Sequence, residues 1–161
     1  MKNTESNYPK RKSVKPIPKG FHTVTPFLTV NGAAGLIDFI TNAFDGEVTS
    51  IMKGDDNKVM HATVQIGDSN IMMSDATEKF VAMPTMLYLY VKDVDSVYQK
   101  AIEANGTSLR GPTDEFYGDR SAGIKDAWDN QWWIATHIED VTPKELEKRK
   151  EKFSAHPQEV N

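Results

Sequence analysis

The sequence predicts an α+β fold built from two β-α-β-β-β units, and three observations lead to that prediction. The same order of strand-like and helix-like segments occurs twice, at a spacing of about sixty residues. Most strand-like segments alternate between two kinds of side chain, as strands do when each face must cover something different. Each helix-like segment inside the repeat has one apolar stripe, so we expect helices on one side of the sheet and a cleft on the other.

The composition restricts the classes of protein and site. With 161 residues and 39% hydrophobic side chains, the chain is long enough for one domain with a real core. It has no cysteine, which excludes disulfides, thiolate nucleophiles and cysteine-based metal centres. That composition agrees with a reducing cytoplasm, which is the expected location. No apolar run approaches the ~20 residues that a membrane span needs, so no membrane partner is expected.

Charge is distributed unevenly along the chain, whose net charge is −4. Residues 1–20 carry six basic side chains against one acidic one, whereas residues 21–142 carry 8 basic and 18 acidic ones. An acidic body argues against nucleic acid as a partner. We expect residues 1–20 to form a disordered basic arm, or alternatively to touch an acidic surface such as the body of this chain.

The first unit starts with a strand pattern at residues 22–30. Residues 31–44 have the pattern of a helix, with Asn31 as its cap. Residues 46–75 then contain a further strand and a hairpin. The apolar stripe of the helix consists of Ala33, Leu36, Ile37, Ile40 and Phe44.

The second unit repeats this order. Residues 85–91 have a strand pattern and residues 93–106 a helix pattern. Residues 107–127 are predicted to form two strands joined by a turn at Gly111–Pro112. The last strand of the repeat is predicted at residues 130–140.

The predicted folded domain spans residues 21–142, with one module at about residues 23–76 and the other at about residues 84–141. Residues 143–161 lie outside the repeat. They form a charged helix and tail that follow a capping box at Thr142–Pro143–Lys144–Glu145. This helix is expected either to be solvated or to dock on a partner.

Sorting the alternate residues of each strand separates two faces. One face is purely apolar and is expected to lie under the helices. The other is too aromatic for open solvent and too polar for a plain core. The apolar face consists of Val24, Leu28, Val30, Met60, Ala62, Val64, Ile66, Leu87, Leu89, Val91, Trp132, Ile134 and Ile138. The mixed face consists of Thr25, Phe27, Thr29, His61, Thr63, Gln65, Met72, Ser74, Met86, Tyr88, Tyr90, Trp133, Ala135 and His137.

Two functions suit the mixed face. Aromatic walls with a few hydrogen-bonding groups are typical of a small-molecule pocket. The same side chains are also typical of a subunit interface. The sorting assumes that no strand contains a β-bulge, because one bulge exchanges the two faces beyond it.

The segments TPFLTVNGAAGLIDFITNAF, MHATVQIGDSNIMMSD, LYLYVKDVDSVYQKAIEANG and YGDRSAGIKDAWDNQWWIATHIEDV, together with the repeat, resemble the glyoxalase/bleomycin-resistance/dioxygenase superfamily, also called vicinal oxygen chelate. Within it, the chain is similar to the PhnB-like branch. The resemblance covers residues 23–141. It implies two βαβββ modules that form an incomplete, cup-shaped mixed β-barrel with the helices outside, and a homodimer. It does not imply one activity, since the superfamily contains lyases, isomerases, dioxygenases and antibiotic-sequestering proteins.

The resemblance also implies where a metal would be held, on the inward faces of four strands. The matching positions fall at or near Thr25, Met72, Met86 and Trp133, and none of them is His, Asp or Glu. A metal of the glyoxalase kind requires nitrogen and oxygen donors, so no metal cofactor is expected. The branch usually has Asp-Pro-Phe-Gly before the last strand, whereas this chain has Asp-Ala-Trp-Asp at residues 126–129.

Other residues are candidates for chemistry. His61 and His137 fall on the mixed face, where they are an alternative set of metal ligands with a carboxylate such as Asp75 or Glu139, although ordinary hydrogen-bonded histidines have the same pattern. His61 is also a candidate general base. Arg120 is a candidate to enter the cleft and bind a carboxylate or phosphate, or alternatively forms a surface pair with its neighbour Asp119.

The sequence therefore predicts a protein that binds a small molecule in the cleft without the usual metal site. Whether it is an enzyme is left open. The alternatives are a lyase or dioxygenase that depends on a divalent metal, and a dimeric interaction protein that has no ligand. The predicted ligand-binding residues are Phe27, His61, Gln65, Met86, Tyr88, Arg120 and Trp133.

Overall fold

The computed structural model describes residues 14–155, so residues 1–13 of the expected basic arm and the last six residues lie outside the described part. Eight strands and three helices follow one another in this part of the chain. Their order is β1 (Phe27–Val30), α1 (Ala33–Phe44), β2 (Glu47–Lys53), β3 (Val59–Ile66), β4 (Ser69–Asp75), β5 (Met86–Tyr90), α2 (Val94–Glu103), β6 (Thr107–Asp114), β7 (Asp119–Lys125), β8 (Gln131–His137) and α3 (Pro143–Ala155).

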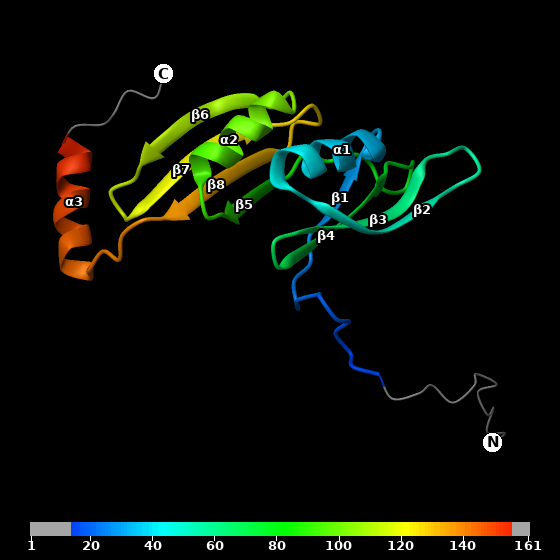
Figure 1. Cartoon of the computed structure of the whole chain (residues 1–161), viewed down its shortest axis with the longest axis horizontal. Coiled ribbons are helices and arrows are strands. Elements are labelled where there is room, and N and C mark those ends of the chain that lie inside the picture. Colours follow the sequence, from blue (N-terminus) through cyan, green and yellow to red (C-terminus); the bar gives the residue numbers. More distant parts are fainter. Residues whose placement is uncertain (1–13, 156–161) are drawn as a thin grey trace.

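The strands form two four-stranded sheets of identical topology, which confirms the two predicted βαβββ modules. Sheet A has the order β1-β4-β3-β2, and sheet B has the order β5-β8-β7-β6. The first strand of each module pairs in parallel with the last, and the other neighbours are antiparallel. The two sheets lie side by side along the length of the molecule (Figure 1). Within the described residues they do not close into a barrel.

Helices α1 and α2 contact each other and pack on the same side of the molecule, α1 over sheet A and α2 over sheet B. The core continues from one module into the other. The buried Trp132 of β8 packs against Phe39 and Phe44 of α1, with ring centroids 6.3 and 4.8 Å apart. Trp128 donates from Nε1 to the carbonyl of Asn31 across the same boundary, at 2.7 Å. The two modules are therefore one packed unit.

The predicted apolar stripe of α1 is buried along its whole length. Its cap, however, differs from the prediction. The N-cap residue is Gly32, with a φ of 87°, and Asn31 lies outside the helix. The carboxylate of Asp75 on β4 replaces a local cap, accepting from Gly32 N at 2.7 Å and from Ala33 N at 3.1 Å. Sequence spacing does not reveal a cap that comes from another strand.

The division of strand residues into two faces holds in the strand centres and fails at two strand ends and at one bulge. Val24 is 82% exposed because β1 begins only at Phe27, after Pro26, which has no N–H to donate. Met60 is 61% exposed because it is the extra residue of a bulge, where Met52 pairs with His61 but Lys53 pairs with Val59. Ile138 is exposed because β8 ends at His137.

The turn predicted at Gly111–Pro112 is absent. Both residues lie inside β6, at an irregularity between Arg110 and Thr113, and the actual hairpin turn follows Asp114. Because β6 is the outer strand of sheet B, one side of it has no ladder partner, and a proline is tolerated there.

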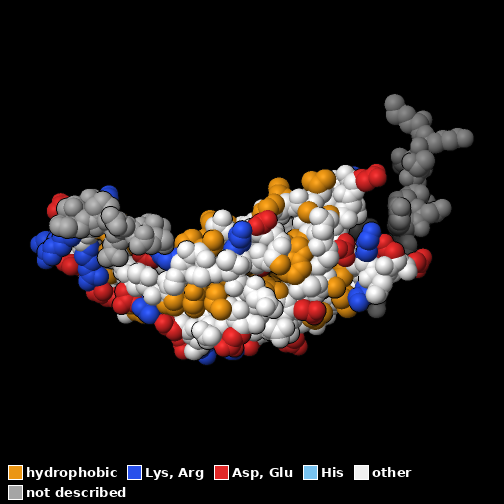
Figure 2. All heavy atoms as spheres, turned by 90° about the horizontal axis from the view of Figure 1, so that it is seen from above, with side chains coloured by type: hydrophobic (Ala, Val, Ile, Leu, Met, Phe, Trp, Pro, Cys, Tyr) orange, Lys and Arg blue, Asp and Glu red, His pale blue; other side chains and the backbone are white. Residues whose placement is uncertain are grey.

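The C-terminal helix α3 packs on its own chain. Glu145 N donates to Thr142 Oγ1 at 3.3 Å, which confirms one half of the capping box. Arg149 pairs with Glu139, and the ring of Phe153 lies 5.0 Å from that of Phe116. In the view of Figure 2, Lys and Arg side chains gather at the end of the molecule that α3 forms, and hydrophobic side chains are more frequent over the middle. No helix within residues 14–155 is long and apolar enough to span a membrane.

Candidate functional site

Each sheet has one face under its helix and one face without a helix, which we call open face A and open face B. Paired residues on neighbouring strands share a face, so the strand register identifies the members of each. On open face A, Phe27 pairs with Met72, which pairs with Thr63. On open face B, Tyr88 pairs with Trp133, which pairs with Gly123.

Open face A borders a cavity of about 670 Å³. Phe27 and Met60 line it from the sheet, and Phe80 lines it from the segment that joins the two modules. That segment folds back onto the sheet, since Met83 N donates to Thr29 O at 3.1 Å. The other residues that line the cavity are Thr29, Asp56, Lys58, Val59, Ser74, Asp75, Ala76 and Thr77. Only Phe27 of this set was a predicted ligand-binding residue.

Asp75 lies in the wall of this cavity, but its oxygens are already engaged. Besides its two bonds at the start of α1, it accepts from Val59 N at 2.7 Å. Burial alone would raise the pKa of Asp75, but the backbone donors Val59, Ala33 and Gly32 and the nearby Lys58 together hold the pKa below its ordinary value. Its role is therefore to fix α1 and the start of β3, and it is poorly suited to a metal ion.

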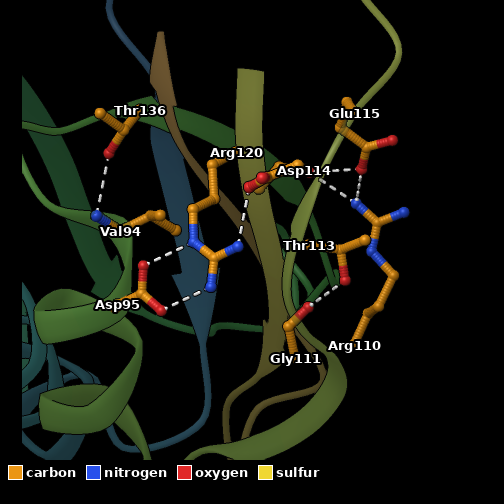
Figure 3. Close-up of polar contacts among 10 residues, drawn as sticks. Val94, Asp95, Arg110, Gly111, Thr113, Asp114, Glu115, Arg120 and Thr136 are labelled. Atoms are coloured by element: carbon orange, nitrogen blue, oxygen red, sulfur yellow. Dashed lines mark hydrogen bonds and ion pairs between the residues drawn. The ribbon is translucent and has the colours of Figure 1, made fainter. Parts of the chain in front are cut away.

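Open face B is aromatic and includes an arginine. The Arg110 guanidinium lies 5.1 Å from the centroid of a Trp133 ring, a cation–π contact. The Trp133 ring lies over Gly123, where a Cβ would approach it to 3.1 Å. Arg110 also pairs with Glu115 and donates to Ser121, and Figure 3 shows its guanidinium turned toward Glu115. The sequence did not identify Arg110, Glu115 and Ser121 as residues of this face. The one signal that the sequence offered for them was a glycine opposite a tryptophan.

A hydrogen-bonded network occupies one end of open face B. The buried Asp119 accepts from Tyr90 Oη at 2.9 Å and contacts His137 Nδ1 at 2.8 Å. His137 Nε2 contacts Asp140 at 3.0 Å. The hydrogen bonds with Asp119 and then Asp140 raise the pKa of His137 above its ordinary value. The hydrogen bond with Asp119 likewise raises the pKa of Tyr90.

Tyr88 lies between this network and Trp133. Its ring centroid is 5.4 Å from that of Tyr90. Burial raises the pKa of Tyr88 far above its ordinary value, and the influence of the Tyr117 side chain raises it further. Tyr88 is therefore protonated, and hence a neutral hydrogen-bonding group, at any physiological pH.

The structure brings the predicted ligand-binding residues together in two groups. Phe27 and His61 lie on open face A, with ring centroids 6.0 Å apart. Met86, Tyr88 and Trp133 lie on open face B, along β5 and β8.

The two remaining predicted residues are engaged elsewhere. The side chain of Gln65 turns to the hairpin end, where its Nε2 donates to Gly67 O at 3.0 Å. Arg120 does not join the open face, because it pairs with Thr136 on the helix-covered face of sheet B. It binds Asp95 of α2 bidentately at 2.7 and 2.8 Å, and Asp114 at 2.7 Å, as Figure 3 shows. Strand parity explains the difference, since Arg110 and Arg120 belong to opposite faces.

The two alternative histidine ligands do not belong to the same sheet. His61 belongs to β3 of sheet A and His137 to β8 of sheet B, where carboxylates contact both ring nitrogens. Glu139 is bound by Arg149. Among residues 14–155, no group of three or more His, Asp or Glu side chains is arranged to hold a metal ion.

The four positions that the resemblance implied supply a hydroxyl, two thioethers and an indole. Thr25 precedes β1, and its Oγ1 donates to His22 O at 3.2 Å. Met72 and Met86 offer soft sulfur, and the indole N–H of Trp133 is a donor only. These residues do not fit a metal ion of the glyoxalase kind.

Comparison with known proteins identifies the family to which this sequence is similar. The sequence model of the Glyoxalase/Bleomycin resistance protein/Dioxygenase superfamily matches residues 20–134. A protein of Mycobacterium bovis described as uncharacterised is 27% identical over 135 residues, covering 77% of this chain and 89% of that protein. A Mycobacterium tuberculosis protein, also described as uncharacterised, is equally similar.

Solved structures share the fold at low sequence identity. TioX from Micromonospora sp. ML1 has a TM-score of 0.63 at 16% identity, with 71% of this chain and 97% of that chain covered. A PhnB protein from Bacillus cereus has a TM-score of 0.55 at 22% identity, with 71% and 99% covered. It is the one representative of the PhnB branch among the neighbours described here. At these identities the similarity concerns the fold alone.

Proposed function

The chain belongs to the glyoxalase/bleomycin resistance protein/dioxygenase superfamily, and on that premise we propose that it binds a small molecule without the superfamily's usual metal site. The ligand lies in a cleft between open face A of one chain and open face B of a second chain. It is compact and partly aromatic or apolar, because the side chains available to it are rings and thioethers.

The exposure of large apolar side chains on both open faces is the observation that carries this proposal. Met86 is 66% exposed and Tyr90 is 67% exposed, and Phe27 and Tyr88 are each about half exposed. Contiguous apolar surface of this kind marks a binding site or an interface. The remaining exposed apolar residues in the same regions are Met52, Met60, Phe80, Val81 and Met83.

A second chain is needed because the two open faces do not face each other within one chain. Sheets A and B lie side by side, with their helices on the same side (Figure 1). A ligand bound to one open face would therefore contact only one of the two sheets. A homodimer in which sheet A of one chain opposes sheet B of the other gives the ligand two walls and buries the exposed apolar side chains.

A thermal-shift screen of compact aromatic compounds tests the proposal. We expect a subset to raise the melting temperature of the wild-type chain, since a ligand at a hundred times its Kd adds about 2.7 kcal/mol. Phe27→Ala and Tyr88→Ala are expected to abolish the shift. Val24→Ala is the matched control, because this apolar residue is exposed but lies outside both sheets.

Metal binding distinguishes the proposal from a metal-dependent lyase or dioxygenase. The chain is incubated with nickel, zinc, iron and manganese, and the bound metal is then quantified. We expect no metal at one ion per chain. Stoichiometric binding that His61→Ala or His137→Ala abolishes would contradict the proposal and favour an enzyme.

A further inference from the structure

One residue from each strand of sheet B forms a row across open face B. The row consists of Arg110 on β6, Gly123 on β7, Trp133 on β8 and Tyr88 on β5, each paired with the next. Because Gly123 has no side chain, the Trp133 ring lies over it and the Arg110 guanidinium lies against that ring. The row therefore has a positive charge at one end and two aromatic rings at the other.

Two neighbours hold the Arg110 guanidinium in place. Its Nη2 donates both to Glu115 Oε1 and to Ser121 Oγ. Ser121 Oγ in turn donates to the same oxygen of Glu115 at 2.7 Å, and Ser121 is buried. The three side chains close a ring of hydrogen bonds, so the guanidinium is fixed before any ligand binds.

The other donors of Arg110 have no hydrogen-bond partner in the described part of the chain. A guanidinium carries five N–H donors, and Nη2 supplies two of them. Nε is buried and takes no partner within residues 14–155. Figure 3 shows one terminal nitrogen of Arg110 joined to Glu115, whereas the other is joined to none of the residues drawn. Since the side chain is 36% exposed, this second nitrogen, Nη1, is the group that a ligand can reach.

A comparison with the other arginines of residues 14–155 indicates which ligand group suits Nη1. Arg120 and Arg149 each bind two carboxylates of the protein, whereas Arg110 binds only Glu115 among these residues. Arg120 binds its second carboxylate, Asp114, through Nη1 alone, at 2.7 Å. A carboxylate on Nη1 of Arg110 would make the same charge-assisted contact, which is stronger than a hydrogen bond between neutral groups.

We propose that Arg110 binds a carboxylate of the ligand while the ring of the ligand contacts Trp133 and Tyr88, so that the cleft selects ionised aromatic acids. The inference rests on the proposed function, because it concerns open face B of the same cleft. Arg110 is a specificity-determining residue. It distinguishes an aromatic acid from a neutral ring compound of the same shape.

A matched pair of probes tests the inference, namely 2-naphthoate and 2-naphthamide, which have the same ring and nearly the same shape but differ in charge. Their Kd values are measured by isothermal titration calorimetry of the full-length protein at neutral pH. We expect naphthoate to bind the wild-type chain about tenfold more tightly, as one charge-assisted hydrogen bond allows. The net charge of −4 repels anions in general, so this preference reports a local positive charge.

Two arginine variants identify the source of that charge. Arg110→Gln is expected to remove the preference for naphthoate, and Arg120→Gln is the matched control that is expected to keep it. Both variants lose one positive charge from sheet B, but Arg120 lies on the helix-covered face. A general loss of stability would weaken both probes, so the ratio of the two Kd values isolates recognition of the carboxylate.

Glu115→Gln gives a second test that leaves Arg110 unchanged. Its amide oxygen still accepts from Arg110 and Ser121, but the negative charge that competes for the guanidinium is gone. We therefore expect the preference for naphthoate to increase by severalfold. A preference that falls in this variant would contradict the inference.

The remaining outcomes separate the inference from the proposed function. Equal affinities of the two probes in the wild-type chain would overturn the inference and leave the proposed function standing. A ratio that Arg110→Gln does not change, or that Arg120→Gln reduces equally, would do the same. If neither probe binds while other compact aromatic compounds do, the inference alone fails, and if no such compound binds, the proposed function fails with it.

Discussion

Asp126 illustrates how one buried carboxylate organises the loop before the last strand. It accepts from Trp132 Nε1 at 2.8 Å, from the backbone and side chain of Asn130 at 2.9 Å each, and from Trp128 N at 2.9 Å. The loop ends with Asp129 at a positive φ of 63°, where the usual pattern of the branch has glycine. The departure from the family's pattern therefore keeps the turn and adds the Trp128 contact to the first module.

Replacing Asp126 by alanine is predicted to lower the free energy of unfolding by about 3 kcal/mol, because buried N–H donors lose their acceptor. Urea unfolding followed by circular dichroism measures the loss. Asp55→Ala is the control, since Asp55 is exposed on the β2–β3 turn, and it is expected to change stability by less than about 0.5 kcal/mol. Similar losses in both variants would contradict the assigned role.

His137 gives a prediction about pH. Its pKa is raised in the folded chain by Asp119 and Asp140, so its contribution to stability is complete below the unfolded value of about 6.5. That contribution is lost as the pH rises through the higher folded value. His137→Gln is therefore expected to be clearly less stable than the wild-type chain at pH 5.5 and closer to it at pH 9. Urea unfolding at the two pH values decides this, with His22→Gln as the control; a difference that does not change with pH would refute it.

Residue positions were predictable from the sequence where a strand is regular. Leu28 and Val30 are buried as alternation predicts, and Trp132 lies in the core while Trp133 lies on the opposite face. The prediction failed where a bulge or a strand end intervenes, as at Met60 and Val24. It also placed Arg120 rather than Arg110 in the cleft, because the register that sets Arg120 opposite Thr136, on the helix-covered face, is not visible in a sequence.

At the scale of elements, the hairpin β6–β7 depends on the close approach of its turn to the chain that follows β8. Gly118→Ala adds a Cβ against Glu139 O and forces a left-handed backbone. It is predicted to cost at least about 2 kcal/mol in unfolding free energy. Gly67→Ala is a matched control, since Gly67 also has a positive φ of 57° but a Cβ there meets nothing within 4 Å.

That control is expected to lose about 1 kcal/mol or less, measured by thermal unfolding of both variants. Equal losses of unfolding free energy in the two variants would mean that backbone strain alone matters and that the contact with Glu139 does not.

The sequence predicted the existence and order of every element of the two modules. It did not predict the continuous β6, because Gly111–Pro112 is ordinarily a turn signal and is tolerated here at a sheet edge.

At the scale of the whole molecule, the exposed apolar open faces predict association. Met86→Asp places a charge on open face B, where Met86 is 66% exposed. We expect this variant to sediment as a monomer in analytical ultracentrifugation, whereas the wild-type chain sediments as a dimer. Its circular dichroism spectrum is expected to be unchanged, because the side chain is not part of the core.

Val24→Asp is the control for this experiment and is expected to remain dimeric. A wild-type chain that is monomeric at high concentration would contradict the shared cleft.

The repeat predicted two modules from the sequence alone, but nothing in the sequence indicates how the sheets are placed relative to each other. That placement, with both helices on one side, is what makes a second chain necessary.

Mixing two variants tests the shared cleft most directly. Phe27→Ala damages sheet A and Tyr88→Ala damages sheet B, so neither homodimer has an intact cleft. In the mixed dimer, the intact sheet A of one chain opposes the intact sheet B of the other. We predict that native mass spectrometry with a compact aromatic compound that stabilises the wild-type chain in the thermal-shift screen detects one bound molecule per mixed dimer and none in either homodimer; a mixed dimer that also binds none, while the wild-type dimer binds two, would show that each cleft belongs to a single chain.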